Sequence, residues 1–280
     1  MRLRISLGPT LAVAVLACGG GTGATAPPPP PPPSAVLLKD VEIPNLPSPY
    51  YHFEYDEAGR VRAASFASEY RIYEVTYQGD RISEVANNTA GNRDRLEYYY
   101  DRAGRVGEVR YADANGLVYA MVTLSYGGQR LTGLERSRKI DADFVVEKTM
   151  SFSYDGNGNL LELVEHRPAI AGRQDEMTTV DRFERYDGNT NVDGFDLLHD
   201  EFFDHLVLLP AVQLQQGNPG RQIHTGDGVN YTVDFTYTYD DAHRPLTKRG
   251  VLQYTNGPDT GQTFQTRSDF TYYAGVGGLQ

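Results

Sequence analysis

The chain has 280 residues, of which 40% are apolar and 22% charged. This apolar content is enough for one substantial core, and it is higher than that of a disordered chain. Its 20 tyrosines, set against 4 methionines and no tryptophan, favour strands over a helical bundle. The net charge of −11 argues against a nucleic-acid partner, because phosphate binding relies on a basic surface. A single cysteine excludes a disulfide framework and a cysteine-based zinc site.

The first residues have the pattern of an export signal. Two arginines precede a mostly apolar stretch, 5–17, which is too short to cross a bilayer as a permanent helix. It ends in Val-Leu-Ala before Cys18, which resembles the lipobox of bacterial lipoproteins, where the cysteine is diacylated and cleavage occurs just before it. We therefore expect a signal peptide at 1–17 and lipidation at Cys18. The alternative is a secretory signal cut after Ala26, which would leave Pro27 next to the cut.

The residues that follow, 18–40, are expected to form a lipidated linker rich in glycine and proline. Its seven consecutive prolines, 27–33, favour a polyproline II rod of roughly 22 Å. A spacer of this kind would hold the following domain, 41–280, away from the membrane.

From residue 50 onward the chain repeats a short pattern. The tyrosines of the first five copies are 22 to 28 residues apart, which leaves room for two strands and their turns. The copies are FEYDEAGRV at 53–61, YYYDRAGRV at 98–106 and FSYDGNGNL at 152–160, with shorter copies around Tyr77 and Tyr126 and a late copy at 237–246. The repeat positions are Tyr55, Asp56, Gly59, Arg60, Tyr77, Gly79, Arg81, Tyr100, Asp101, Gly104, Arg105, Tyr126, Gly128, Arg130, Tyr154, Asp155, Gly158, Tyr239, Asp240 and Arg244.

Each copy predicts one β-hairpin. An aromatic residue, a polar residue and the tyrosine alternate with period two, so that both rings point to one face of a sheet. The aspartate and the glycine supply turn chemistry, and we expect Gly59 and Gly104 to have positive φ. The same alternation runs through 231–239, where aromatic and apolar residues share one face and polar residues the other.

The motif resembles the YD repeat of RHS-type bacterial surface proteins, whose unit is Tyr-Asp, a short spacer, Gly-Arg and a branched apolar residue. The whole mature chain is similar to a family of surface lipoproteins of unknown function with a porin-like fold. This resemblance implies an all-β protein: an antiparallel β-meander of successive hairpins curling into an open or partly closed barrel, with one late helix and loop insert at about 188–222. Where the family pattern has Asn-Pro-Phe, this chain has Asn-Val-Asp-Gly-Phe at 191–195. The family carries no catalytic residues to transfer.

The insert contains the one convincing helical pattern, over 195–209. Its apolar residues recur at spacings of three and four, which predicts one apolar stripe that plugs the sheet. The stripe consists of Leu198, Phe202, Leu206 and Leu209.

Metal sites find little support in this segment. His199 and His205 are six residues apart, so the four-residue spacing of a helical zinc site is missing. A calcium loop is the better candidate, but it has Asn at the first ligand position, Asp at the last, and no entering helix. We therefore expect no metal and no cofactor. The residues of the candidate calcium loop are Asn189, Asn191, Asp193 and Asp200.

The sequence favours binding over catalysis. It contains no nucleophile elbow, P-loop or dinucleotide fingerprint, so we expect a non-enzyme. Our hypothesis is a lipid-anchored β-domain of the cell envelope, at the outer membrane, that acts as a binding or scaffold module. Its partners would be the membrane, through the N-terminal lipid, and a carbohydrate or an envelope protein. Most tyrosines are expected in the core, and any exposed ring would suit stacking on a sugar.

Two alternatives stay open. An enzyme acting on polysaccharide would show two carboxylates facing each other across a cleft. A membrane-spanning barrel would need an apolar outer band on nearly every strand. Against the second alternative, Glu54, Glu74, Glu97 and Asp234 are expected on the face opposite the aromatic residues.

Overall fold

The structure is a computed structural model that describes residues 36–89, 93–199, 207–209 and 211–274. Within these residues there are sixteen β-strands and one short 3-10 helix, η1, at Gly194–Leu198. The strands are β1 Leu38–Glu42, β2 Tyr51–Tyr55, β3 Val61–Phe66, β4 Arg71–Gln78, β5 Arg81–Asn87, β6 Arg95–Tyr100, β7 Val106–Ala112, β8 Val118–Gly127, β9 Arg130–Ile140, β10 Asp143–Tyr154, β11 Leu160–Arg167, β12 Met177–Glu184, β13 Arg221–Gly226, β14 Tyr231–Tyr239, β15 Pro245–Tyr254 and β16 Thr263–Tyr272.

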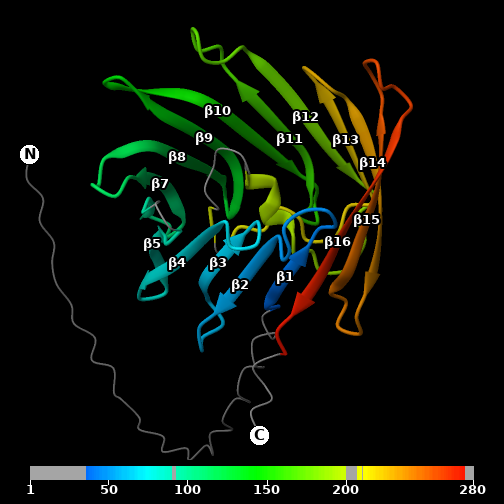
Figure 1. Cartoon of the computed structure of the whole chain (residues 1–280), viewed down its shortest axis with the longest axis horizontal. Helices are drawn as coiled ribbons and strands as arrows, with labels where there is room; N and C mark the ends of the chain where they lie inside the picture. Colours follow the sequence, from blue (N-terminus) through cyan, green and yellow to red (C-terminus); the bar gives the residue numbers. More distant parts are fainter. Residues whose placement is uncertain (1–35, 90–92, 200–206, 210, 275–280) are drawn as a thin grey trace, which may run out of the picture. The chain divides into compact units, whose positions relative to one another are not determined.

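The strands form one closed antiparallel barrel (Figure 1). Each strand pairs with its neighbours in sequence, and β1 pairs with β16 to close the ring. The expected all-β meander of successive hairpins is confirmed, and the barrel is fully closed where an open or partly closed one was expected. β1 begins at Leu38, inside the stretch expected to be linker. All described strands belong to one compact unit, 34–280.

The apolar face of the meander points into the barrel. In β14, for example, Val233 is 5% exposed, whereas the next residue, Asp234, faces outward. Pairing carries this alternation around the ring, since residues directly opposite one another share a face. Val85 of β5 thus faces Leu96 of β6 inside, while Glu84 faces Glu97 outside. The charged residues expected opposite the aromatic face therefore lie on the outer surface.

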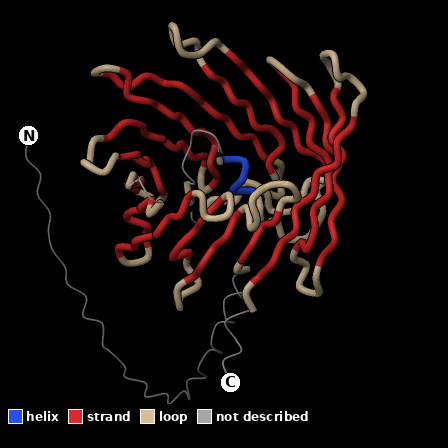
Figure 2. The backbone as a smooth tube through the Cα atoms, in the orientation of Figure 1, coloured by secondary structure: helices blue, strands red, loops and turns tan. Residues whose placement is uncertain are grey.

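The segment between β12 and β13 lies inside the ring of strands (Figures 1 and 2). We call its described residues, 185–199, 207–209 and 211–220, the plug segment. Val207 and Leu214 belong to the buried core, and Phe195, Leu198 and Leu209 pack against it. A plug made by the insert is thus confirmed for these residues, whereas Phe202 and Leu206 lie outside the described part of the chain.

The long helix expected in the insert is wrong for the residues that the structure describes. Residues 195–198 belong to the 3-10 helix (blue in Figure 2), and 207–209 are not helical. The short helix ends at Leu198, and the next residue, His199, is extended, with its Nδ1 2.7 Å from the Tyr51 hydroxyl of β2. A contact across the barrel therefore overrides the helical spacing. No helix in the described part of the chain is long and apolar enough to cross a membrane.

Each repeat aspartate builds its hairpin turn. Asp56 Oδ1 accepts hydrogen bonds from the backbone N–H groups of Ala58 and Arg60, both at 2.9 Å. Its Oδ2 accepts from the Arg60 guanidinium, 2.8 Å from Nε. Gly59 has φ +75° and Gly104 has φ +80°, so the positive φ expected for these glycines is confirmed. A β-bulge at the tyrosine recurs in the hairpins that carry the motif, which are β2–β3, β4–β5, β6–β7, β8–β9, β10–β11 and β14–β15.

The repeat tyrosines tie successive hairpins together along one end of the barrel, which we call the rim. Seven hydroxyls, five of them from the repeat tyrosines, each donate a hydrogen bond to a backbone carbonyl at the start of a strand in a neighbouring hairpin, an interaction that stabilises by about 1 kcal/mol. The bonds run from Tyr55 to Leu38, Tyr77 to Val61, Tyr100 to Ile82, Tyr126 to Val106, Tyr154 to Leu131, Tyr186 to Leu160 and Tyr272 to Pro245, at 2.6 to 2.9 Å. The repeat tyrosine Tyr239 instead donates to the Asp187 carboxylate.

The repeat arginines complete the rim. Each guanidinium lies over the tyrosine ring of the next hairpin, a cation–π contact that contributes about 0.5–1 kcal/mol at exposed sites. The repeat motif therefore joins each hairpin to the next one around the rim. The pairs are Arg60 over Tyr77 at 4.3 Å, Arg81 over Tyr100 at 5.0 Å, Arg105 over Tyr126 at 4.5 Å, Arg130 over Tyr154 at 5.6 Å and Arg244 over Tyr272 at 4.5 Å.

Candidate functional site

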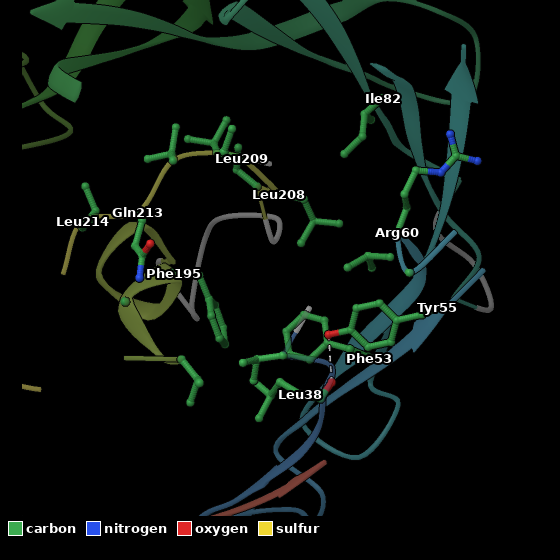
Figure 3. A pocket seen from close by; sticks show the side chains of 18 of the residues that line it. Leu38, Phe53, Tyr55, Arg60, Ile82, Phe195, Leu208, Leu209, Gln213 and Leu214 are labelled. Atoms are coloured by element: carbon green, nitrogen blue, oxygen red, sulfur yellow. Dashed lines mark hydrogen bonds between the residues drawn. The ribbon is translucent and has the colours of Figure 1, made fainter. Parts of the chain in front are cut away.

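A cavity of about 550 Å³ lies between the inner faces of β1–β5 and the plug segment (Figure 3). Leu38, Phe53 and Ile82 form the wall on the sheet side and are only 6%, 5% and 1% exposed. Phe195 and Leu208 face them from the plug segment. The rings of Phe53 and Phe195 meet edge to face, with their centroids 5.3 Å apart. We call this cavity the rim pocket.

The edge of the rim pocket is polar. The Tyr55 hydroxyl donates to the Leu38 carbonyl at 2.9 Å, and burial raises the pKa of Tyr55 to about 12, so this phenol is neutral at physiological pH. Arg60 reaches the same edge, held by the Asp56 carboxylate and stacked on Tyr77. The repeat thus places the Arg60 guanidinium and the phenols of Tyr55 and Tyr77 beside an apolar cavity.

The described lining of the rim pocket is mostly apolar. Among its described lining residues the rim pocket has no serine, threonine, cysteine, histidine or lysine. Its described carboxylate, Asp80, has a fully exposed side chain and lies 3.7 Å from Arg60 Nη1. An apolar cavity with a few convergent polar groups is the usual form of a small-molecule site.

A second, polar cavity of about 720 Å³ lies between the β10–β11 turn, the end of β12 and the plug segment. Asp155 and Asp187 contribute carboxylates to it. Hydrogen bonds, first from the Asn159 backbone, lower the pKa of Asp155. Burial alone would raise the pKa of Asp187, but hydrogen bonds from Tyr239 and Asn218 outweigh it and the pKa is lowered. Asp155 and Asp187 thus do not have the raised pKa that the general acid of a glycosidase needs; a third carboxylate, Glu184, also lines the cavity. We call this cavity the polar groove.

The candidate calcium residues are engaged with protein groups. The Asn191 amide donates to Asp193 Oδ1 at 3.0 Å, and Asp193 Oδ2 accepts from Lys248 Nζ at 2.8 Å. Asn189 lies in the polar groove, and Asp200 is outside the described residues. Across the described part of the chain, no group of three His, Cys, Asp or Glu side chains is arranged to hold a metal ion.

Two asparagines that sequence reasoning missed lock the plug segment in place. Asn159 Oδ1 accepts the N–H groups of Gln216 and Gly217, at 3.1 and 2.9 Å. Asn218 is 1% exposed, and its backbone N–H donates to Asp187 Oδ1 at 3.0 Å. Asn159 stands where the repeat usually has arginine, so a departure from the repeat was the available signal.

The predicted site residues fall into three groups. Tyr55, Gly59, Arg60 and Tyr77 line the rim pocket, and the other repeat residues build the rim around the barrel. Of the candidate calcium residues that the structure describes, Asn191 lines the rim pocket and Asn189 the polar groove. Cys18, the expected lipidation site, lies outside the described residues.

Two solved structures are similar to this chain. A porin-like protein from Bacteroides vulgatus ATCC 8482 is 17% identical, with a TM-score of 0.55, and the match covers 85% of this chain and 99% of that one. A porin-like protein from Bacteroides uniformis ATCC 8492 is 14% identical, with a TM-score of 0.53, over 80% of this chain and 89% of that one. The chain thus has a porin-like β-barrel fold. No family model and no curated protein sequence matches it.

Proposed function

We propose that the protein is a non-enzymatic binding module whose barrel holds a ligand with an apolar body in the rim pocket. The observation that carries this proposal is the cavity of about 550 Å³ with walls of buried apolar side chains. This volume falls within the range of about 300–1,000 Å³ that small-molecule sites occupy. Burial of apolar ligand surface supplies roughly 25 cal/mol for each Å².

The polar edge of the pocket narrows the ligand class. A neutral Tyr55, the cationic Arg60 and the carboxylate of Asp80 flank the cavity, so an amphipathic ligand would place its apolar body against Phe53 and its polar end at the rim. A fatty acid or a similar chain with one polar end fits this arrangement.

We also propose that the barrel stands in the aqueous envelope, tethered by lipid at Cys18. The lipobox-like start, the proline spacer and the likeness of the repeat to the YD repeats of surface proteins support the anchor and an outer-membrane location. The outer face of the barrel carries charges along its strands, for example the pair of Arg182 and Glu162 at 2.8 Å. Such a face suits water, whereas a spanning barrel needs an apolar outer band.

Carbohydrate binding is the second candidate function, and the polar groove favours it. Asn157 and Asn189 bring amide groups there, and Asp155 and Asp187 bring carboxylates, which is the chemistry that hydrogen-bonds sugar hydroxyls. The repeat tyrosines give this candidate little support, because their hydroxyls and rings make contacts within the rim.

Val61→Trp tests the rim pocket. Val61 starts β3 and lines the cavity, so an indole there would fill space that the ligand needs. We expect the affinity for cis-parinaric acid, a fluorescent fatty acid, to fall about tenfold or more, the effect of losing about 1.4 kcal/mol. The measurement is a fluorescence titration of the chain from Ser34 onward, which contains every described strand.

Val251→Trp is the matched control, because Val251 is 41% exposed and pairs with the outward Asp234. Its affinity should equal that of the unaltered chain. If Val61→Trp binds the probe as tightly as Val251→Trp, the rim pocket is not the binding site.

Cys18→Ala tests the anchor. We expect it to abolish incorporation of a labelled fatty acid and to move the protein from the membrane to the soluble fraction, because acyl transfer requires the thiol. Ala26→Leu is the control: it blocks a secretory cut after Ala26 and leaves the lipobox-like residues intact. Equal labelling of Cys18→Ala and the unaltered chain would remove the lipid anchor from the proposal.

A further inference from the structure

A row of aromatic side chains crosses four neighbouring strands, β13 to β16, which lie side by side in one wall of the barrel (Figure 1). His224 of β13 lies directly opposite Tyr231 of β14, and Tyr231 lies opposite Tyr254 of β15. Phe264 of β16 continues the row, because its partner in β15 is Leu252, two residues before Tyr254. None of the four aromatic residues lines the rim pocket or the polar groove. We call His224, Tyr231, Tyr254 and Phe264 the aromatic row.

Strand alternation places the aromatic row on the inner face of the barrel. Residues an even number apart in a strand share a face. Tyr231 is two residues from Val233, which is 5% exposed, and Phe264 is six residues from Phe270, which is 4% exposed. The row lies at the end of the barrel away from the rim, since β14 begins at Tyr231 and ends at the repeat tyrosine Tyr239. Phe264 is nevertheless 49% exposed, so solutes can reach the inner face at this end.

The rings of the aromatic row lie against one another. His224 and Tyr231 are stacked, with their centroids 4.6 Å apart and their planes at 12°. Tyr254 and Phe264 meet edge to face, with their centroids 5.5 Å apart and their planes at 68°. Because neighbouring strands are about 4.8 Å apart, the rings of β14, β15 and β16 extend over roughly 10 Å. A linear disaccharide has a comparable length.

Hydrogen-bonding groups lie beside these rings. Asp181 of β12 lies opposite His224, and its Oδ1 is 2.8 Å from His224 Nδ1 and accepts from Gln222 Nε2 at 2.9 Å. Burial, and after it the charge of Asp181, raises the pKa of Tyr231 to about 12, so this phenol is protonated at physiological pH. Unlike the tyrosine hydroxyls of the rim, the Tyr231 hydroxyl makes no hydrogen bond to another described residue. It can therefore donate to a ligand.

The charges beside the aromatic row favour a neutral ligand. The partners of Asp181 in the described part of the chain are His224 and Gln222, so no lysine or arginine neutralises its carboxylate. An acidic ligand would meet this carboxylate and a protein whose net charge is −11. A sugar hydroxyl, by contrast, can donate to the carboxylate or accept from the Tyr231 phenol.

We propose that the aromatic row binds a neutral oligosaccharide, with sugar rings packed on the aromatic side chains and sugar hydroxyls at Asp181 and Tyr231. The face of an aromatic ring is negative, so it attracts the weakly positive C–H groups on the face of a pyranose while both bury apolar surface. This site goes beyond the apolar ligand proposed for the rim pocket. It also differs in place from the polar groove, so that each of the three sites can fail without the others.

The test is calorimetric titration of the full chain with three neutral hexasaccharides, cellohexaose, maltohexaose and chitohexaose, and with the acidic hexagalacturonic acid. We expect at least one neutral hexasaccharide to bind, and to bind more tightly than the acidic one. Phe264→Ala and Tyr254→Ala should each weaken binding of that probe about tenfold or more, because each removes one ring from the aromatic row. Tyr254→Phe keeps the ring and should restore most of the affinity.

Phe144→Ala is the matched control for Phe264→Ala. Phe144 is 39% exposed and lies in β10, opposite Lys139 of β9, so the same atoms are lost from a similarly exposed site outside the aromatic row. This variant should bind the hexasaccharide as the unaltered chain does. Phe264→Ala should in turn leave the affinity for cis-parinaric acid unchanged, which separates the aromatic row from the rim pocket. Thermal melts confirm that each variant is folded.

Three results would overturn the inference. The first is that no neutral hexasaccharide binds the unaltered chain, or that the acidic one binds more tightly. The second is that Phe264→Ala and Tyr254→Ala bind as tightly as Phe144→Ala. The third is that Asn157→Ala, a change in the polar groove, weakens binding while the variants of the aromatic row do not, which would place the sugar in the polar groove instead.

Discussion

Tyr98→Ala is expected to lower the free energy of unfolding by roughly 3–5 kcal/mol, whereas Tyr99→Ala should lower it by about 1 kcal/mol or less. The two tyrosines are neighbours in β6 and lose the same atoms. Tyr98 points into the barrel and is 7% exposed, while Tyr99 points outward and is 42% exposed. The pair therefore measures which face of the meander is the core.

The large effect at Tyr98 has two sources. Its ring fills the interior, so that alanine would leave a cavity that the closed barrel cannot collapse. Its hydroxyl also accepts the Leu208 N–H of the plug segment at 3.1 Å, and that donor would lose its partner. Tyr99 lies on the outer surface, with Arg110 over its ring at 4.3 Å. Water would fill the space that its ring leaves.

Urea unfolding of the full chain, followed by tyrosine fluorescence and circular dichroism, gives both free energies. Equal losses at the two positions would mean that both faces of β6 are equally buried. That outcome would contradict a water-facing outer surface and restore the membrane-spanning alternative.

The repeat allowed much of the fold to be predicted because it encodes local structure. Tyrosine, aspartate and glycine at fixed spacing define a bulge, a turn and a positive φ, and all three depend on neighbouring residues only. Closure of the barrel was not predictable in this way. It depends on β1 meeting β16, more than two hundred residues apart, and no local pattern reports such a register.

The insert shows where periodicity fails. The helical spacing after residue 195 is real in the sequence, but His199 is extended because its ring contacts Tyr51 and Phe66 inside the barrel. The helix would also have started at Asp193, whose side chain makes no capping bond and pairs with Lys248 instead. Tertiary contacts of this kind outweigh the small free-energy differences of helix propensity.

The clustering of cationic side chains on β9–β11 was also not predictable from the sequence. Arg136, Lys148 and Arg167 lie on three strands, and their spacing matches no motif. Only the pairing register brings them together. By contrast, the places where the plug segment is held were marked in the sequence, as departures from the repeat. Asn159 replaces the repeat arginine, and His243, which replaces the glycine, contacts Asn189 of the plug segment at 2.9 Å.

Gly217→Val is expected to lower the free energy of unfolding by roughly 3 kcal/mol or more, at the upper end of what overpacking costs. Gly217 is buried in the plug segment, and a Cβ there would lie 2.3 Å from the Asp187 carbonyl oxygen. That neighbour is backbone and has no rotamer to change. The clash is relieved only if residues 187 and 217 move apart. Two hydrogen bonds from Asn218 to the Asp187 carboxylate oppose that movement.

Gly188→Val is the control, because Gly188 lies in the same plug segment and a Cβ there meets nothing within 4 Å. Its unfolding free energy should change little, by about 0.5 kcal/mol. Other residues of the plug segment, Phe195 and Leu208 among them, form one wall of the rim pocket, so displacement of the segment by Gly217→Val should weaken binding of cis-parinaric acid while Gly188→Val does not. Equal stability of the two variants would mean that residues 187 and 217 are not in contact, and the rim pocket would then lose the wall that Phe195 and Leu208 provide.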